Sequence, residues 1–377
     1  MKKGITWMAA ALVSVALASP ALASGDPIRI GVQGAHSGDL ASYGVPSLNA
    51  ARIVIDEVNA NGGILGRTVE LVSQDDQCKP ELATNAATRL ISDGVAAVMG
   101  PICSGPTNAS LPLFESAKLI SVSPTATTPA LTLEGAHPLF FRTVANDLAQ
   151  AELTSSYALN VLKVKNVAYV HDNGEYGKGF ASQNRALLEK GGVKTVLFEA
   201  ITPDAVDFSP TIRKLRRAKP DLIVFGGYQP AASKLVQQMR RDRVRTPLIG
   251  PDGVKDETFL KMTGKDSEGT LASYPKDTSA LDMYRKAREA HVTAFGSEPG
   301  FGYYNAYAAM QAILKAIETS GGTDTPALLD ALRANTVDTP LGKLSFNRNG
   351  DAAGLGLSIY VARDGKFVET DHNIILK

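Results

Sequence analysis

Hydroxyl side chains follow two apolar segments of this sequence, and such side chains can bind a small anion. Ser104 and Thr107 come soon after the run VAAVMG, and Thr125, Thr127 and Thr128 come soon after the segment LISVS. Hydroxyl groups donate hydrogen bonds without carrying a charge, and neither loop holds an acidic or basic residue. The two loops together therefore predict a site for a small carboxylate. For either loop taken alone, a simple helix-capping role stays open.

These hydroxyls depend for their position on a predicted connection between a strand and a helix. The run VAAVMG is typical of a strand buried on both faces, and the segment ICSGPTNAS after it is typical of a helix start. In doubly wound α/β sheets, ligands bind outside the carboxyl ends of the strands, where free N–H groups of a helix start attract an anion. We therefore expect both loops at one sheet edge. Pro112 lies inside the predicted helix, so we expect a kink or a late restart there.

Strand and helix patterns alternate along the first half of the chain and then start again. IRIGVQG, TVELVSQDD, VAAVMG and LISVS are predicted strands, with helical stripes between them. From about Asn166 the pattern repeats: NVAYVHDNGEYG parallels IRIGVQGAHSGDLASYG, with a Tyr-Gly pair before the helix in both. Such alternation is typical of mostly parallel sheets covered by helices. We expect an α/β protein with two Rossmann-like lobes of one topology.

The C-terminal part departs from this alternation. It holds a predicted helix from about Phe301, another in TPALLDALRAN and a hairpin that turns at Asp364-Gly365. We expect this tail to complete the first lobe and then to add strands to the second, so that three crossings form a hinge. The predicted divisions are a signal peptide at 1–23, an N-terminal lobe at 24–144 plus 276–352, and a C-terminal lobe at 145–275 plus 353–377.

The second half offers polar strand ends that complement the hydroxyl loops. Tyr176 lies in HDNGEYG, Tyr228 in FGGYQP and Asp252 in IGPDGV. A ligand carboxylate would meet Ser104, Thr127 and backbone N–H groups, and a ligand ammonium would meet Asp252 and a backbone carbonyl. These charge-assisted bonds are roughly twice as strong as neutral ones. No second acidic or basic residue stands at the strand ends assigned to the site, which favours a ligand with a neutral side chain.

Patterns of catalytic or metal sites are not found in the sequence. It has no GxSxG, P-loop or HExxH motif, no GxGxxG after the first strand, and five scattered histidines without metal-ligand spacing. His171 ends a predicted strand, where a structural role is favoured, and the adjacent Asp75 and Asp76 suit a loop better than acid–base work. We therefore predict no enzyme, no metal and no cofactor.

Composition argues against nucleic-acid and lipid partners. The 377 residues favour two domains, and 44% hydrophobic with 20% charged residues is ordinary for a globular protein. The net charge is +1 and the basic residues are spread along the chain, which argues against a basic binding face. The run RKLRRAK at 213–219 is interpreted as the solvated face of a helix.

The N-terminus has the pattern of a secretory signal peptide. Lys2 and Lys3 precede an apolar stretch at 5–18, and Ala21-Leu22-Ala23 supplies a cleavage site. No cysteine follows that site directly, so a lipid anchor is not expected, and the mature protein is expected in the periplasm.

Only two cysteines occur, Cys78 and Cys103, and in an oxidising compartment we expect them to pair. The bond would tether the loop immediately before Ser104. The spacing differs from the CxxC of redox-active pairs, so a structural role is favoured.

Several segments occur in an order that resembles a known family. They include IRIGVQGAHSGDLASYG, DDQCKPELA, VMGPICSGPT, SPTATTPALT, VAYVHDNGEYGKG, FGGYQP and IGPDGV. In this order they resemble the type I periplasmic binding proteins of the leucine/isoleucine/valine group, which feed ABC transporters. The resemblance covers nearly the whole mature chain and implies two lobes that close on a ligand.

The resemblance also implies a set of ligand-binding residues. These are Tyr43, Ser104, Thr125, Ala126, Thr127, Tyr176, Tyr228 and Asp252. Thr125 and Thr127 match the pair that contacts the α-carbon groups of the ligand, and Asp252 matches the acid that holds the α-ammonium. The leucine binders of the family commonly have Glu at the position of Asp252, Ala at that of Thr125, and a run of serines in place of Ser104-Gly105-Pro106.

The function implied is that of a periplasmic solute-binding protein. It would capture a neutral aliphatic, branched-chain amino acid and deliver it to an ABC permease in the inner membrane, acting as a monomer. Because Asp252 is shorter than Glu, another small amino acid such as γ-aminobutyrate stays open, as does an aromatic acid. A ligand-binding sensor module is a further alternative with the same fold.

Overall fold

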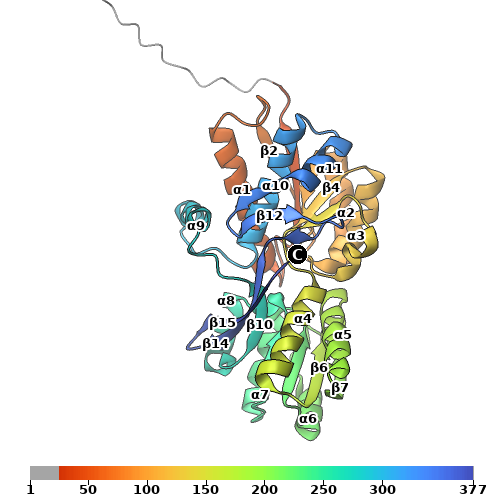
Figure 1. Cartoon of the computed structure of the whole chain (residues 1–377), viewed down its shortest axis with the longest axis vertical. Coiled ribbons are helices and arrows are strands. Elements are labelled where there is room, and N and C mark those ends of the chain that lie inside the picture. The colour runs from red at the N-terminus through yellow and green to blue at the C-terminus, as the bar shows by residue number, and fades with distance from the viewer. Residues whose placement is uncertain (1–24, 377) are drawn as a thin grey trace, which may run out of the picture.

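The computed structural model describes residues 25–376, so the predicted signal peptide lies outside the described residues. The chain forms two α/β lobes that follow one another along the long axis of the molecule (Figure 1). Each lobe is built around its own sheet. Between residues 25 and 376, no helix combines the length and the apolar character needed to cross a membrane.

The sheet of the first lobe is parallel throughout, with the strand order β2-β1-β3-β4-β5. Its strands are β1 (Ile28–Gly34), β2 (Val69–Asp75), β3 (Ala97–Met99), β4 (Ile120–Ser123) and β5 (Phe140–Arg142). The helices of this lobe are α1 (Ala41–Ala60), α2 (Pro80–Ser92), α3 (Ser104–Ser116), α10 (Tyr303–Ser320) and α11 (Thr325–Ala334). A small antiparallel sheet contains β11 (Val337–Thr339), β12 (Gly342–Phe346) and β13 (Ala352–Ala353).

The sheet of the second lobe has the order β15-β14-β10-β9-β8-β6-β7. Its strands are β6 (Asn166–His171), β7 (Lys194–Ala200), β8 (Leu222–Gly226), β9 (Leu248–Gly250), β10 (Leu271–Pro275), β14 (Gly356–Arg363) and β15 (Lys366–Ile375). The helices of this lobe are α4 (Asp147–Tyr157), α5 (Glu175–Lys190), α6 (Ser209–Ala218), α7 (Gln229–Arg241) and α8 (Glu257–Thr263). The next helix, α9 (Asp282–Phe295), packs against α1 and α10 of the first lobe. Short turns of helix lie at Pro129–Leu131, Leu133–Gly135, Ala158–Leu162, Asp252–Val254 and Gly264–Ser267.

The two lobes share one topology, as the sequence predicts. The order β7-β6-β8-β9-β10 repeats the order β2-β1-β3-β4-β5, and the second lobe then adds the antiparallel strands β14 and β15. The apolar face of α10 fills the core of the first lobe with Tyr303, Ala306, Met310, Ile313 and Ile317, all nearly inaccessible to solvent. Spacings of three and four residues place these side chains on one helical stripe. The C-terminal part of the chain therefore adds α10 to the core of the first lobe and β14 and β15 to the sheet of the second, which confirms the predicted architecture.

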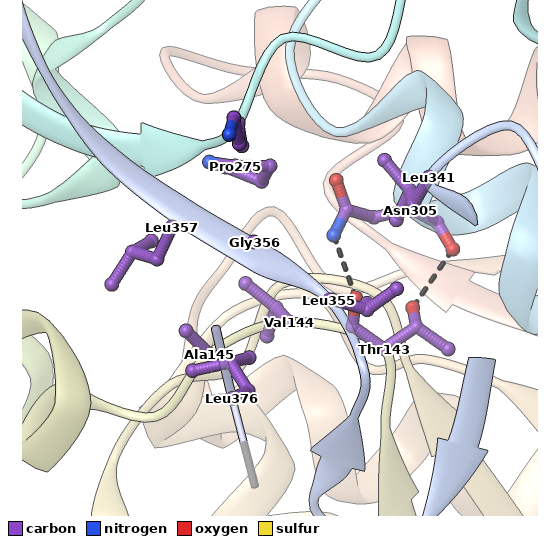
Figure 2. Close-up of a pocket in the computed structure, with 11 residues that line it drawn as sticks. Thr143, Val144, Ala145, Pro275, Asn305, Leu341, Leu355, Gly356, Leu357 and Leu376 are labelled. Carbon is purple, nitrogen blue, oxygen red and sulfur yellow. Dashed lines mark hydrogen bonds between the residues drawn. The ribbon is translucent and has the colours of Figure 1, made fainter. Parts of the chain in front are cut away.

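Three chain segments cross between the lobes side by side. They come together around a small pocket lined by Val144 and Ala145, by Pro275, and by Leu355 and Leu357 (Figure 2). β10 and β14 pair in an antiparallel register that places Pro275 opposite Leu357, which keeps two of the crossings together.

The first crossing is also tied to α10. The Thr143 hydroxyl donates to the Asn305 carbonyl at 2.8 Å, and the Asn305 amide donates to the Thr143 carbonyl at 2.7 Å (Figure 2). The residue boundaries between the lobes, at 144/145, 275/276 and 352/353, stay predictions from the sequence.

One local expectation is wrong, and so is part of another. α3 continues through Pro112 to Ser116, so the late restart does not occur, while a kink at Pro112 stays a prediction. Proline removes one backbone hydrogen bond, but the fully buried Leu111 and Phe114 on either side hold this helix against its neighbours. The Tyr-Gly pairs lie inside α1 and α5, in the first turn, because both helices begin earlier than their apolar stripes.

Candidate functional site

The carboxyl ends of the strands of both lobes meet around a narrow pocket with a cavity volume of about 10 Å³. From the first lobe it is lined by Tyr43, Ile102, Cys103, Thr125 and Phe301, and from the second by Tyr176, Tyr228, Asp252 and Gly253. The Cys78–Cys103 disulfide is present, as predicted, with its Cα atoms 5.6 Å apart. It fixes the residue immediately before α3, so the start of this helix is held at the pocket wall.

The two hydroxyl loops lie together. Ser104, the first residue of α3, is buried, and its Oγ accepts a hydrogen bond from the Thr128 N–H at 3.2 Å. The Thr107 hydroxyl donates to the carbonyls of Pro101 and Cys103, so its hydrogen is used within the protein. The Thr125 hydroxyl donates to the Ile102 carbonyl at 2.7 Å. These bonds set the distance between the loops.

Thr127 and Thr128 carry the unused hydroxyls of this edge. Both residues are buried, and neither Oγ1 has a hydrogen-bond partner among the described residues. The backbone of Ala126 is fully used, because its N–H donates to the Ser123 hydroxyl and its carbonyl accepts from Arg142. Neither residue lines the pocket, and the Thr127 hydroxyl faces the Asp147 carboxyl group, whose pKa it lowers.

Arg142, which sequence reasoning missed, holds the loop that carries these threonines. Its guanidinium is fully buried and donates to the carbonyls of Ala126 and Thr128, to the Thr132 hydroxyl and to the Asp351 carboxylate, the last at 2.6 Å. Burial lowers the pKa of Arg142, and the Asp351 charge opposes that shift. All of its assigned contacts are within the protein, so Arg142 positions the loop.

Asp252 lies on the opposite wall and is almost fully buried. Its Oδ1 accepts a hydrogen bond from the Tyr176 hydroxyl at 2.6 Å and from the Gln150 amide at 3.2 Å. Burial raises the pKa of Asp252, and these two donors partly oppose the shift. The tyrosine thus stabilises the ionised acid at the pocket wall.

A second acid, Asp147, stands next to Asp252, contrary to the expectation that the site has one acidic group. Asp147 begins α4, directly after the N-cap residue Asn146, and it is fully buried. Burial and the nearby charge of Asp252 raise the pKa of Asp147 well above its usual value. The sequence ANDLAQ signals the helix start, but it gives no sign that this start lies beside Asp252.

Aromatic rings enclose the pocket. The Tyr43 ring lies 5.5 Å from Tyr228 and 4.6 Å from Phe301, both edge-on, and the Tyr176 ring lies 4.9 Å from Tyr228. Burial raises the pKa of Tyr43, Tyr176 and Tyr228, so all three stay neutral phenols. Phe301 was predicted only as the start of a helix, and its place in the pocket was missed.

Tyr43 joins the two lobes directly. Its hydroxyl donates to the Gly253 carbonyl at 2.5 Å and accepts from the Gln229 N–H at 3.0 Å. Both partners belong to the second lobe, whereas Tyr43 belongs to α1 of the first. These bonds hold the lobes in a closed arrangement.

The glycine after each tyrosine is required by close packing. A Cβ at Gly44 would collide with the Ala35 carbonyl, and a Cβ at Gly177 would collide with the Gly226 carbonyl. Each glycine therefore lets its helix start approach a strand end, which brings the preceding tyrosine into the pocket.

The other residues considered from the sequence have structural contacts. The buried His171 accepts a hydrogen bond from the Asn173 N–H and packs on Phe198. Asp75 accepts bonds from neighbouring loop residues, and Asp76 accepts from Gln33 and from the Cys78 N–H. None of the three lines the pocket.

Comparisons with known proteins agree with the resemblance seen in the sequence. A family model described as "Periplasmic binding protein" matches residues 27–366. The chain is 33% identical to the leucine-, isoleucine-, valine-, threonine- and alanine-binding protein of Pseudomonas aeruginosa, over 96% of this chain and 97% of that protein. It is 31% identical to the Leu/Ile/Val-binding protein of Escherichia coli K12, over 92% of this chain and 94% of that protein.

A solved structure agrees as well. The substrate-binding protein of a branched-chain amino acid transporter from Streptococcus pneumoniae, in complex with isoleucine, matches with a TM-score of 0.83 and 25% identity. The match covers 91% of this chain and 100% of that one.

Proposed function

This chain belongs to the periplasmic binding protein family, and we propose that it captures a neutral aliphatic amino acid of the branched-chain type between its two lobes. It then delivers the amino acid to the permease of an ABC importer. The named relatives bind leucine, isoleucine and valine, which supports this ligand class.

One observation carries the proposal: the two walls of the pocket are complementary to the two ends of a zwitterion. The first lobe lines the pocket with uncharged described residues, among them Thr125, and the buried hydroxyls of Ser104 and Thr127 lie in the same two loops. The second lobe supplies the buried carboxylate of Asp252. A carboxylate on one side and an ammonium on the other would make charge-assisted bonds with both walls.

The individual roles follow from this polarity. Ser104 and Thr127 donate to the ligand carboxylate, together with the N–H groups at the start of α3. Asp252 accepts from the ligand ammonium, and Tyr176 orients Asp252 through their 2.6 Å hydrogen bond. Thr125 and Ala126 shape the first wall, while Tyr43 and Tyr228 cover the ligand.

The side chain of the ligand is proposed to be apolar. Ile102 and Phe301 line the pocket beside the tyrosines, and burying each methylene there stabilises the complex by about 0.8 kcal/mol. Leucine, isoleucine and valine should therefore bind more tightly than alanine. Members of the family bind substrates rather than transform them, and we propose no catalytic activity for this chain.

Transport would use closure of the lobes about the three crossings. The protein groups proposed to bind the ligand come from both lobes. A bound ligand would therefore stabilise the closed arrangement, in which Tyr43 already joins the two lobes. We propose that the chain is exported by a signal peptide cleaved after Ala23, that it works in the periplasm as a monomer, and that the closed form docks on the permease.

Calorimetric titration of the mature protein tests the ligand assignment. Leucine, isoleucine, valine, alanine, γ-aminobutyrate and benzoate would be titrated separately into protein freed of bound ligand by unfolding and refolding. We expect the three branched-chain amino acids to bind most tightly. If they fail to bind at millimolar concentration while γ-aminobutyrate or benzoate binds, the assignment is wrong.

A further inference from the structure

Two buried carboxylates, that of Asp252 at the pocket wall and that of Asp147 beside it, are held by one side chain. The Gln150 Nε2 donates to Asp147 Oδ1 at 3.1 Å and to Asp252 Oδ1 at 3.2 Å. The Gln150 Oε1 is fixed in turn by the Asp252 N–H at 3.1 Å and by the Ser273 hydroxyl at 2.6 Å. Every polar atom of this amide is used, so Gln150 holds the two acids close together in a fixed geometry.

Asp147 has one oxygen that no charged donor contacts. The residue is fully buried, and its Oδ2 has no hydrogen bond of good geometry among the described residues. The Thr127 hydroxyl faces this carboxyl group and lowers its pKa, but by less than burial raises it. The Asp147 N–H donates to the Thr127 carbonyl at 2.9 Å, which places Asp147 between the hydroxyl loops and Asp252. A buried ionised carboxylate beside a second acid is strongly disfavoured when only a neutral hydroxyl faces it, so the pair requires either a proton or a cation.

Charged and titratable groups around the pair come from several elements. Arg142 on β5 faces Asp147, but its guanidinium is bonded to Asp351. The groups facing one or both acids from other elements are neutral phenols: Tyr43 of α1, Tyr176 of α5, Tyr228 before α7 and Tyr274 of β10. On β15, His372 packs against Tyr157 at the opposite end of α4, and Glu369 of the same strand is bonded to Ser358 of β14. Lys255, three residues after Asp252, lies with its Nζ over the Tyr274 ring at 4.0 Å. Among the described residues, no cation is thus bonded to either acid of the pair without also being bonded to another acid.

We propose that Asp147 and Asp252 share one proton in the ligand-free protein, and that the ammonium group of the ligand replaces this proton. The inference rests on the proposed function, because it requires a ligand that carries an ammonium group. Asp147 would then contact the ligand as a second acceptor, and it would be a specificity-determining residue for amino compounds.

The proton balance is simple. In the empty site, one carboxyl group is protonated and the other is ionised, so the pair carries one negative charge. The amino acid enters as a zwitterion, its ammonium bonds to both carboxylates, and the shared proton leaves to solvent. The acid pair and the ammonium together then still carry one negative charge, so the buried charge is the same before and after binding. Raised pKa values of both acids, caused mainly by burial, agree with a retained proton.

The proposal predicts a pH dependence with a definite sign. Binding releases a proton wherever the empty pair holds one, so affinity rises with pH, by up to about tenfold per unit, until the empty pair loses its proton. Above that pH the dependence disappears. A carboxylate ligand without an ammonium group, such as benzoate, would show no such release.

Calorimetry in buffers of different ionisation enthalpy counts the protons. Leucine would be titrated at mildly acidic pH into wild-type protein, Asp147→Asn and the control Asp172→Asn. Asp172 is a suitable control because burial raises its pKa to about 6 and it lies outside the acid pair. We expect close to one released proton for wild type and Asp172→Asn, and none for Asp147→Asn. Circular dichroism melting would verify that each variant is folded.

The outcomes separate the two proposals. Leucine binding to wild type without proton release overturns the shared proton, and so does unchanged release in folded Asp147→Asn. Loss of the release in Asp172→Asn alone assigns the proton to Asp172 and also overturns it. If leucine, isoleucine and valine all fail to bind wild type, the proposed function fails first and this inference fails with it.

Discussion

The two lobes have the same strand order but opposite chemistry at their strand ends. In the first lobe, the loops that follow β3 and β4 contain hydroxyls, small residues and backbone N–H groups. In the second lobe, the loops that follow β8 and β9 contain Tyr228 and the acid Asp252. Under the proposed function, the shared topology would fix where a ligand binds, and the loops would decide which end of the ligand each lobe binds. A repeated fold can in this way build a site that distinguishes the two ends of a small zwitterion.

The paired tyrosines show the same contrast on a smaller scale. Tyr43 and Tyr176 each precede a glycine in the first turn of a helix, at equivalent places in the two lobes. The Tyr43 hydroxyl bonds across the cleft to Gly253 and Gln229, whereas the Tyr176 hydroxyl bonds within its own lobe to Asp252 and to the Gly253 N–H. One residue type thus serves closure in one lobe and electrostatics in the other.

The largest expected effect comes from removing the charge of the second lobe. Asp252→Ala should weaken leucine binding by about 3–5 kcal/mol, because a desolvated ammonium loses its counter-charge. Calorimetric affinities of folded wild type and variant would measure this loss. Ser104→Ala, at the hydroxyl wall, is the matched comparison and should cost less. Equal losses, or a larger loss from Ser104→Ala, would show that Asp252 is not the ammonium partner.

Only the first lobe has a disulfide, Cys78–Cys103, and removing this bond should have the next largest effect. Replacing Cys78 and Cys103 by Ser releases a loop of about 25 residues and should lower the free energy of unfolding by roughly 3 kcal/mol in the chain-entropy model. Urea unfolding would measure it. Ligand affinity should fall as well, since Ser104 directly follows Cys103. Two free thiols in native, exported protein would contradict the assigned disulfide.

The fold and part of the candidate site could be predicted from the sequence. Strand and helix periodicity gave the two-lobe architecture, and the residues after each apolar strand gave the candidate site, because a parallel sheet brings strand ends together. The pocket contains Tyr43, Thr125, Tyr176, Tyr228 and Asp252 from the predicted set. Their roles toward a ligand stay predictions.

The groups that support the site could not be predicted in the same way. Arg142 pairs with Asp351 across 209 residues, and Gln150 bonds to Asp252 across 102 residues, so their environment depends on how the chain crosses between the lobes. β5 is only three residues long, too short for a periodic signal. A buried polar residue looks like a surface residue until tertiary packing is known.

Removing one donor from the hydroxyl wall should have a moderate effect. Ser104→Ala is expected to weaken leucine binding by about 1–3 kcal/mol, because other donors remain for the carboxylate. It also removes the acceptor of the Thr128 N–H. Ser116→Ala, at the exposed end of the same helix, is a control that should leave affinity unchanged. An unchanged affinity in Ser104→Ala would exclude this hydroxyl from the carboxylate site.

The smallest effect is expected from the tyrosine that bridges the lobes. Tyr43→Phe keeps the ring packing on Tyr228 and Phe301 but removes the bonds to Gly253 and Gln229. Neutral hydrogen bonds of this kind contribute about 0.5–1.5 kcal/mol each, so closure should be weakened with little change in the chemistry of the pocket. Small-angle scattering should therefore show a larger radius of gyration for ligand-free Tyr43→Phe than for wild type, and similar values for both with saturating leucine.

Tyr176→Phe provides the counterpart in the second lobe. It removes a donor from Asp252 without touching an interlobe bond, so it should lower affinity while leaving the ligand-free radius of gyration as in wild type. The two variants would thus separate closure from charge stabilisation, the two roles that the paired tyrosines divide between the lobes. If Tyr176→Phe expanded the ligand-free protein as much as Tyr43→Phe did, the division of roles would be wrong, and both tyrosines would act on closure.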